Sequence, residues 1–90
     1  MLTEAPLVLV TGGAKRVGAE IVRTLARNGA RVIIHYGTSR EEAEQLLSEI
    51  GGKACGHSCV QYDLSDSEGV PAFVKSLPQD LSAVVNNASL

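Results

Sequence analysis

The stretch Leu7–Gly18, LVLVTGGAKRVG, is the most informative part of this 90-residue chain about its fold. An apolar run ends at Thr11-Gly12-Gly13, which is typical of a buried parallel strand that enters a turn. From Val17 onward the apolar side chains recur at helical spacing, so the stretch predicts a strand, a turn and a helix. Such a unit presents backbone N–H groups and a helix N-terminus to phosphates.

The rest of the chain continues this alternation. Apolar residues at helical spacing predict helices, short β-branched or apolar runs predict strands, and glycine ends two of the helices. The predicted elements after the first strand are a helix at Val17–Asn28, a strand at Arg31–Tyr36, a helix at Arg40–Ile50, a strand at Gly56–Tyr62, a helix at about Asp66–Ser76 and a strand at Leu81–Val85.

This order of elements predicts an α/β fold: a Rossmann-like, doubly wound parallel sheet with right-handed crossovers. The strand order in such a sheet is 3-2-1-4, and a nucleotide binds across the carboxyl ends of strands 1 and 4. Gly12–Gly18 and Asn86–Ser89 would meet there. We expect residues 1–90 to be an incomplete sheet, the dinucleotide-binding N-terminal part of a longer single domain.

Two serines have the spacing of helix capping boxes. Ser39 precedes Glu42 by three residues, and Ser65 precedes Glu68 by three. In a capping box the serine hydroxyl and the acidic side chain each bond a free backbone N–H at the helix start. We therefore expect both serines to act as N-caps.

The two cysteines, Cys55 and Cys59, flank His57. In an extended segment their Cα atoms lie about 13 Å apart, too far for a disulfide. No second ligand pair follows at zinc spacing, so we expect no metal site. We expect reduced, partly buried thiols, and a surface or strand histidine at His57.

Composition excludes several classes of function. A formal net charge of −2 and the absence of a long basic run argue against a nucleic-acid partner. The apolar run Leu7–Val10 is far shorter than the roughly 20 residues of a membrane span, and Glu4 lies where a signal peptide would be basic. We expect a cytoplasmic protein.

The loop after the first strand fits neither of two common phosphate motifs. Gly13 and Gly18 have the spacing of a P-loop, but the Lys-Ser/Thr pair is absent, and G-x-G-x-x-G is absent too. Gly12 permits a sharp turn, and Gly18 lets the helix lie close to the strand. Lys15 and Arg16 add positive charge. The alternative is an ordinary glycine-containing turn with two solvated basic residues.

Thr11–Gly18 resembles the cofactor loop of the short-chain dehydrogenase/reductase family, with Asp63-Leu64 and Asn86-Asn87-Ala88 in that family's order and spacing. The family pattern is TGxxxGxG, and here Arg16 replaces the middle glycine. Lys15-Arg16, His35-Tyr36 and Asn86–Ser89 (NNAS) are similar to the pteridine reductases of the family.

The resemblance implies which residues bind the cofactor. Asp63 would accept a hydrogen bond from the adenine amino group, and Leu64 would pack on the ring. The alternative for Asp63 is a solvated loop residue, and asparagines at a strand end can also satisfy turn backbone. The remaining residues implied are Gly12, Lys15, Arg16, Val17 and Gly18 in the loop, and Asn87, Ala88 and Ser89 along the ribose and nicotinamide.

Residues just beyond the second strand select the cofactor, because an acidic side chain there binds the ribose 2′-OH of NAD and repels a 2′-phosphate. No Asp or Glu occurs between His35 and Glu41, whereas Tyr36, Thr38, Ser39 and Arg40 offer hydroxyls and a guanidinium. We therefore predict NADP(H). The pteridine reductases have Arg-Ser where this chain has Thr38-Ser39, so Arg40 or Arg16 would replace that arginine.

Enzymes of this family use a Tyr-x-x-x-Lys pair and a serine for catalysis, and the resemblance implies that all three lie well beyond residue 90. Tyr36 and Tyr62 are followed four residues on by Arg40 and Asp66. The resemblance thus implies the cofactor-binding half of a longer, oligomeric reductase that transfers hydride to a C=N or C=O bond, with a pterin as the favoured substrate. Alternatives are a ketone or 3-oxoacyl substrate, or a non-catalytic NADP(H)-binding or interaction module.

Overall fold

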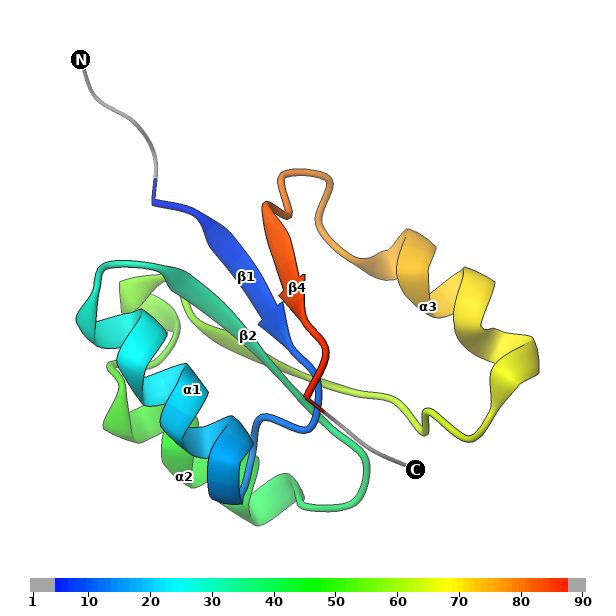
Figure 1. Cartoon of the computed structure of the whole chain (residues 1–90), viewed down its shortest axis with the longest axis horizontal. Coiled ribbons are helices and arrows are strands. Elements are labelled where there is room, and N and C mark those ends of the chain that lie inside the picture. Colours follow the sequence, from blue (N-terminus) through cyan, green and yellow to red (C-terminus); the bar gives the residue numbers. More distant parts are fainter. Residues whose placement is uncertain (1–4, 88–90) are drawn as a thin grey trace.

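The computed structural model describes residues 5–87 and contains one four-stranded sheet (Figure 1). All strand pairs are parallel, in the order β3-β2-β1-β4, which confirms the predicted doubly wound α/β arrangement. The strands are β1 (Leu7–Val10), β2 (Arg31–Tyr36), β3 (Ser58–Gln61) and β4 (Ala83–Val85). The helices are α1 (Arg16–Arg27), α2 (Arg40–Glu49) and α3 (Val70–Ser76), with 3₁₀ turns at Lys53–Cys55 and Ser67–Gly69.

The central strand β1 is buried along its whole length, because β2 and β4 flank it and its side chains pack in apolar clusters on both faces of the sheet. Leu7 pairs with Arg31 of β2, and Val10 pairs with Val85 of β4. A strand covered in this way has an unbroken apolar sequence rather than alternation. The run LVLV predicted a buried parallel strand, and the structure confirms it.

Two helices cover one face of the sheet (Figure 1). Val22 of α1 and Leu46 of α2 pack in a single apolar cluster with Val10, Val32 and Ile34 of the strands. The other face carries a smaller cluster of Leu7, Leu9 and Ile33, contacted by Leu77 and Leu81.

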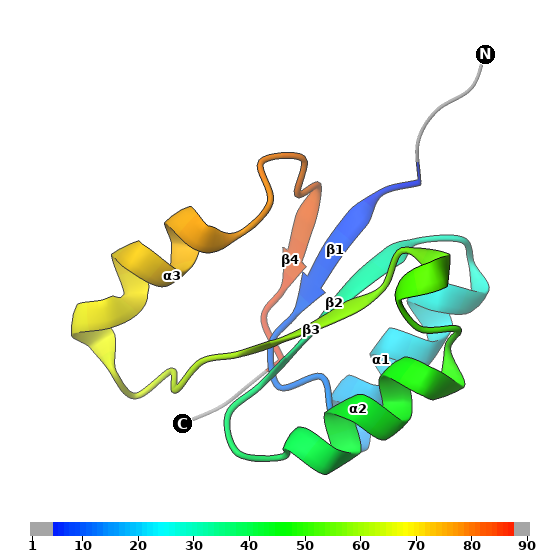
Figure 2. The same ribbon diagram turned by 180° about the vertical axis from the view of Figure 1, so that it is seen from behind.

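Helix α3 is placed differently from the other two helices. Seen from both sides, it lies apart from α1 and α2, on the other side of the sheet (Figure 2), where its Phe73 meets the His35 ring of β2. None of its residues is buried. Val74 of α3 and Val84 of β4 are both more than half exposed. In the described part of the chain, β4 is therefore an exposed edge of the sheet.

Ser39 holds the N-cap position of α2 as predicted, but neither predicted capping box forms. Ser39 precedes α2 with φ −89° and ψ 57°, outside the extended region usual for an N-cap, and makes no side-chain cap bond. The Ser65 hydroxyl instead donates to the Asp63 carboxylate, at 2.7 Å. Asp66 precedes the 3₁₀ turn, and α3 proper starts only at Val70, next to Pro71, whose ring suits a first helical turn.

His57 is buried just before β3, which corrects the expectation of a surface or strand residue. Its Nδ1 accepts a hydrogen bond from the backbone N–H of Val32, at 3.1 Å. Removal from water lowers the pKa of His57, because burial penalises the charged ring. The buried His57 ring thus links β2 to the residue just before β3.

The two cysteines are free thiols, and only Cys59 is partly buried; Cys55 is exposed. Burial raises the pKa of the Cys59 thiol, whose Sγ lies 3.4 Å from the carbonyl of Ala43.

Across residues 5–87, no helix has the length and apolar content needed to cross a bilayer.

Candidate functional site

Three segments far apart in the sequence meet at the carboxyl ends of the strands. They are Thr11–Gly18, here called the glycine loop, the end of β2 and the end of β4. The Thr11 N–H donates to the Val85 carbonyl at 3.0 Å, and the Gly13 N–H donates to the His35 carbonyl at 2.9 Å. The glycine loop is thus joined to both neighbouring strands, where nucleotides bind in sheets of this topology.

Two polar residues after β4 fix the start of the glycine loop. The Asn87 side-chain amide donates to the Gly12 carbonyl at 3.1 Å, and the Asn87 N–H donates to the Thr11 hydroxyl at 3.0 Å. That hydroxyl lies 3.2 Å from the Asn86 side-chain oxygen. Asn87 therefore has a structural role in the loop. The other two predicted residues of this segment, Ala88 and Ser89, lie outside the described residues.

Glycine is required at two positions of the loop. Gly12 has φ 63°, in the left-handed region that side chains disfavour. A Cβ at Gly18 would lie 2.2 Å from the Gly12 carbonyl oxygen and 2.7 Å from Nδ2 of Asn87. The predicted turn at Gly12 and the predicted close approach of the helix at Gly18 are both present.

Arg16 stands where the family pattern has glycine, and its backbone has a glycine-like conformation. Its φ is 57°, and it is the one non-glycine residue with positive φ among residues 5–87. A left-handed conformation costs an ordinary residue roughly 1–2 kcal/mol. Strain of this kind persists where the surrounding structure imposes it and clusters at functional sites.

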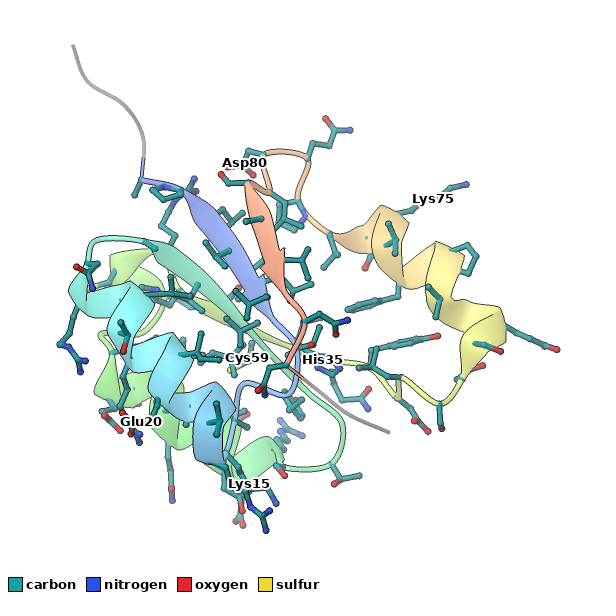
Figure 3. The ribbon with its side chains drawn as sticks, in the orientation of Figure 1. Lys15, Glu20, His35, Cys59, Lys75 and Asp80 are labelled. Carbon is teal, nitrogen blue, oxygen red and sulfur yellow. The ribbon has the colours of Figure 1, made fainter. Side chains whose placement is uncertain are left out.

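The first turn of α1 has the properties of an anion-binding site. Its N-cap residue, Lys15, makes no side-chain cap bond, and the turn contains no acidic residue. The N–H groups of the first helical turn have no partner within a helix, and the helix dipole adds positive potential there. Lys15, Arg16 and Val17 are all exposed at this end, and Figure 3 shows Lys15 at the start of α1.

The turn after β2 lies against this helix start. Tyr36, Gly37 and Ser39 line a cavity of about 90 Å³ together with Gly12 and Lys15. Thr38 is exposed beside them. The structure thus brings the residues predicted to select the cofactor against the residues predicted to bind its phosphates.

Arg40 is already engaged in an ion pair. Its Nε lies 3.1 Å from a carboxylate oxygen of Glu44, one turn further along α2, and both side chains are more than half exposed. The guanidinium would have to leave or share Glu44 to reach a ligand in the turn after β2. The sequence alone did not indicate this competition.

Asp63 and Leu64 follow β3 in a turn at the same edge of the sheet. One Asp63 carboxylate oxygen accepts bonds from the N–H and hydroxyl of Ser65, at 3.0 and 2.7 Å, which lowers the pKa of Asp63. Asp63 is exposed and Leu64 is half-buried. The carboxylate is therefore ionised and held by the turn, and its second oxygen has no bond within the described chain.

The model of the family described as short chain dehydrogenase matches residues 6–90. The chain belongs to this family. It is 33% identical over 85 residues to a 3-oxoacyl-acyl-carrier-protein reductase of Staphylococcus aureus (strain Mu50 / ATCC 700699), covering 91% of this chain and 35% of the relative. The chain thus spans about a third of the length of this family member.

Two solved structures resemble the fold closely. One is FolM alternative dihydrofolate reductase 1 from Brucella canis in complex with NADP, with a TM-score of 0.76, 39% identity, and coverage of 94% of this chain and 35% of that one. The other is BdcA in complex with NADPH, with a TM-score of 0.79, 32% identity, and coverage of 94% and 32%. Both agree with the Rossmann-like fold predicted for a short-chain dehydrogenase.

The principal site residue that sequence reasoning missed is His35. It was noted only as part of the His35-Tyr36 resemblance, yet its ring bonds the glycine loop directly, with Nδ1 3.0 Å from the Gly12 nitrogen. A signal was present, because a polar side chain in an otherwise apolar strand must find hydrogen-bond partners when buried. The pattern could not say where those partners lie.

We expect Gly18→Ala to destabilise the protein by about 2 kcal/mol, since the new methyl group would overlap the Gly12 carbonyl and the Asn87 amide. Urea unfolding followed by circular dichroism measures the change. Gly37→Ala is the matched control, because a methyl group there would meet no atom within 4 Å and the φ of Gly37 is not positive. Equal stability of the two variants would contradict the close-packing argument.

Proposed function

We propose that this chain is the N-terminal, cofactor-binding part of an NADP(H)-dependent short-chain reductase, within a single domain that extends beyond it. The observation that carries the proposal is the N-terminus of α1, which has no side-chain cap and begins with Lys15 and the strained Arg16. Backbone N–H groups and two cations converge there, which suits the pyrophosphate of a dinucleotide. Gly12, Val17 and Gly18 complete this phosphate site.

The residues after β2 support NADP(H) rather than NAD(H). The turn from Tyr36 to Ser39 contains no carboxylate to bind a 2′-hydroxyl or repel a 2′-phosphate. Thr38 and Ser39 offer hydroxyls, and Arg40 can form a bidentate pair with a phosphate once it leaves Glu44. Similar structures solved with NADP and NADPH bound agree with this choice.

The remaining residues have roles along the rest of the cofactor. Asp63, whose second carboxylate oxygen is available, would accept the adenine amino group, with Leu64 against the ring. Asn87, Ala88 and Ser89 would line the ribose and nicotinamide. When bound, the dihydronicotinamide supplies a hydride to the carbon of a C=N or C=O bond, whose heteroatom takes up a proton.

A pterin is the favoured substrate. Lys15-Arg16, His35-Tyr36 and the NNAS segment support it, and so does the 39% identity to an alternative dihydrofolate reductase. The competing substrate is a 3-oxoacyl thioester, supported by the relative from Staphylococcus aureus. The Tyr-x-x-x-Lys pair that would donate the proton is not found in these 90 residues. A further alternative is therefore a non-catalytic NADP(H)-binding module with an interaction surface at the exposed edge of β4.

Calorimetric titration with NADPH and NADH tests the preference for NADP(H). The variant Glu44→Gln tests the part of Arg40 in that preference. We expect the wild-type chain to bind NADPH more tightly than NADH. Glu44→Gln frees Arg40 from its ion pair, so NADPH should bind about two- to threefold more tightly, with NADH unchanged. Glu49→Gln is the control, because Glu49 lies at the other end of α2 and pairs with Arg23 of α1. Equal affinity for the two cofactors would contradict the proposed specificity.

The substrate is tested by NADPH oxidation in the full polypeptide that the gene encodes. We expect turnover with dihydropterin or dihydrofolate at a higher kcat/KM than with a 3-oxoacyl thioester, because the cofactor loop has the pteridine-reductase pattern. The reverse order would favour the oxoacyl reductase. Saturable NADPH binding with no oxidation of either substrate would favour the non-catalytic module.

A further inference from the structure

The imidazole of His35 is buried between two parts of the proposed cofactor site. Only 2% of the residue is exposed, and it lies near the carboxyl end of β2 (Figure 3). Its Nδ1 lies 3.0 Å from the Gly12 nitrogen in the glycine loop, and its Nε2 lies 2.8 Å from the Tyr62 carbonyl oxygen after β3. One ring thus spans the gap between the two segments.

The partners of the ring determine its protonation. The backbone N–H of Gly12 can only donate, so Nδ1 must accept and carries no proton. The Tyr62 carbonyl can only accept, so the hydrogen must lie on Nε2. The contacts therefore specify a neutral imidazole protonated at Nε2. Both ring nitrogens are thus engaged by backbone groups of the chain itself.

His35 also determines which loop amides face a ligand. Its ring accepts a hydrogen bond from the Gly12 N–H, and its carbonyl accepts one from the Gly13 N–H at 2.9 Å. Both glycine amides are thereby turned inward, toward β2. The amides left for an anion are those at the start of α1, next to Lys15 and Arg16.

An aromatic contact holds the ring from the side of α3. The Phe73 ring meets the His35 ring edge-on, with centroids 6.2 Å apart and planes at 60°. Phe73 also stacks on Tyr62, with centroids 4.5 Å apart. The Tyr62 hydroxyl in turn donates to the Asp66 carbonyl. Tyr62 and the Asp63-Leu64 turn that follows it are therefore fixed relative to His35.

We propose that His35 is a positioning residue for cofactor binding, which holds the glycine loop and the turn at Asp63-Leu64 at a fixed separation. The inference rests on the proposed binding of NADP(H), in which the loop binds the phosphates and the turn binds the adenine. Fixing both before the cofactor arrives removes an ordering cost from binding, so the affinity depends on both hydrogen bonds of the ring.

Two variants separate these hydrogen bonds. His35→Asn keeps an acceptor near the position of Nδ1 and loses the bond to Tyr62. His35→Gln keeps a donor near the position of Nε2 and loses the bond to Gly12. His57→Asn is the matched control, because His57 is also buried and also accepts a β2 backbone N–H with Nδ1, yet it lies at the opposite end of the sheet.

NADPH affinity is measured by calorimetry on the full polypeptide, at a temperature at which circular dichroism shows each variant folded. We expect both His35 variants to bind NADPH about tenfold more weakly, and His57→Asn to bind as the wild type does. In turnover assays the KM for NADPH should rise in the His35 variants with little change in kcat. Folded His35 variants with wild-type affinity would overturn the proposal. Failure of the wild type to bind NADPH would instead overturn the proposed function.

Nuclear magnetic resonance of the wild-type polypeptide tests the tautomer independently of whether the variants fold. Long-range proton–nitrogen correlation spectra of the histidine rings distinguish the nitrogen that carries hydrogen. We expect His35 to be neutral with hydrogen on Nε2, both before and after saturation with NADPH. Hydrogen on Nδ1, or a ring that changes its protonation or tautomer when NADPH binds, would overturn the proposed role.

Discussion

The close contact between Gly18, in the first turn of α1, and the turn at Gly12 holds the candidate site together. Gly18 faces the Gly12 carbonyl and the Asn87 amide at distances that leave no room for a side chain. This contact sets the direction of α1 and brings its N-terminus to the carboxyl edge of the sheet. The positive end of the helix therefore lies between the segments that follow β2 and β4. All the chemistry proposed for the chain follows from this placement.

The positive charge at the start of α1 has no acidic side chain beside it in the first helical turn. The helix start carries Lys15 and Arg16 with no acidic residue in the first turn, and Arg16 retains a left-handed backbone where glycine would be unstrained. By contrast, Arg23 and Arg31 lie away from the carboxyl edge of the sheet and are paired, Arg23 with Glu20 and Glu49 and Arg31 with Asp80. A strained, exposed arginine at an uncapped helix start is consistent with a site for a phosphorylated ligand.

The main features of the fold could be predicted because each depends on local sequence. The buried run Leu7–Val10, the glycine at Gly29 and the β-branched run Arg31–Tyr36 each determine their own segment, and the alternation of elements then limits the topology. Features that depend on side-chain partners could not be predicted. Ser65 bonds Asp63 instead of capping a helix, and the buried ring of His57 bonds the backbone of Val32 in β2.

The candidate site shows the same division. Its backbone elements follow from the glycine spacing, whereas the bridge through His35 and the ion pair of Arg40 depend on contacts between distant or competing groups. The most direct test of the account is a titration of the ¹⁵N-labelled polypeptide with NADPH, followed by amide chemical shifts. We expect the largest shifts at residues 14–18 and 37–40. Shifts confined to the outer faces of α1 and α2, with those residues unchanged, would contradict it.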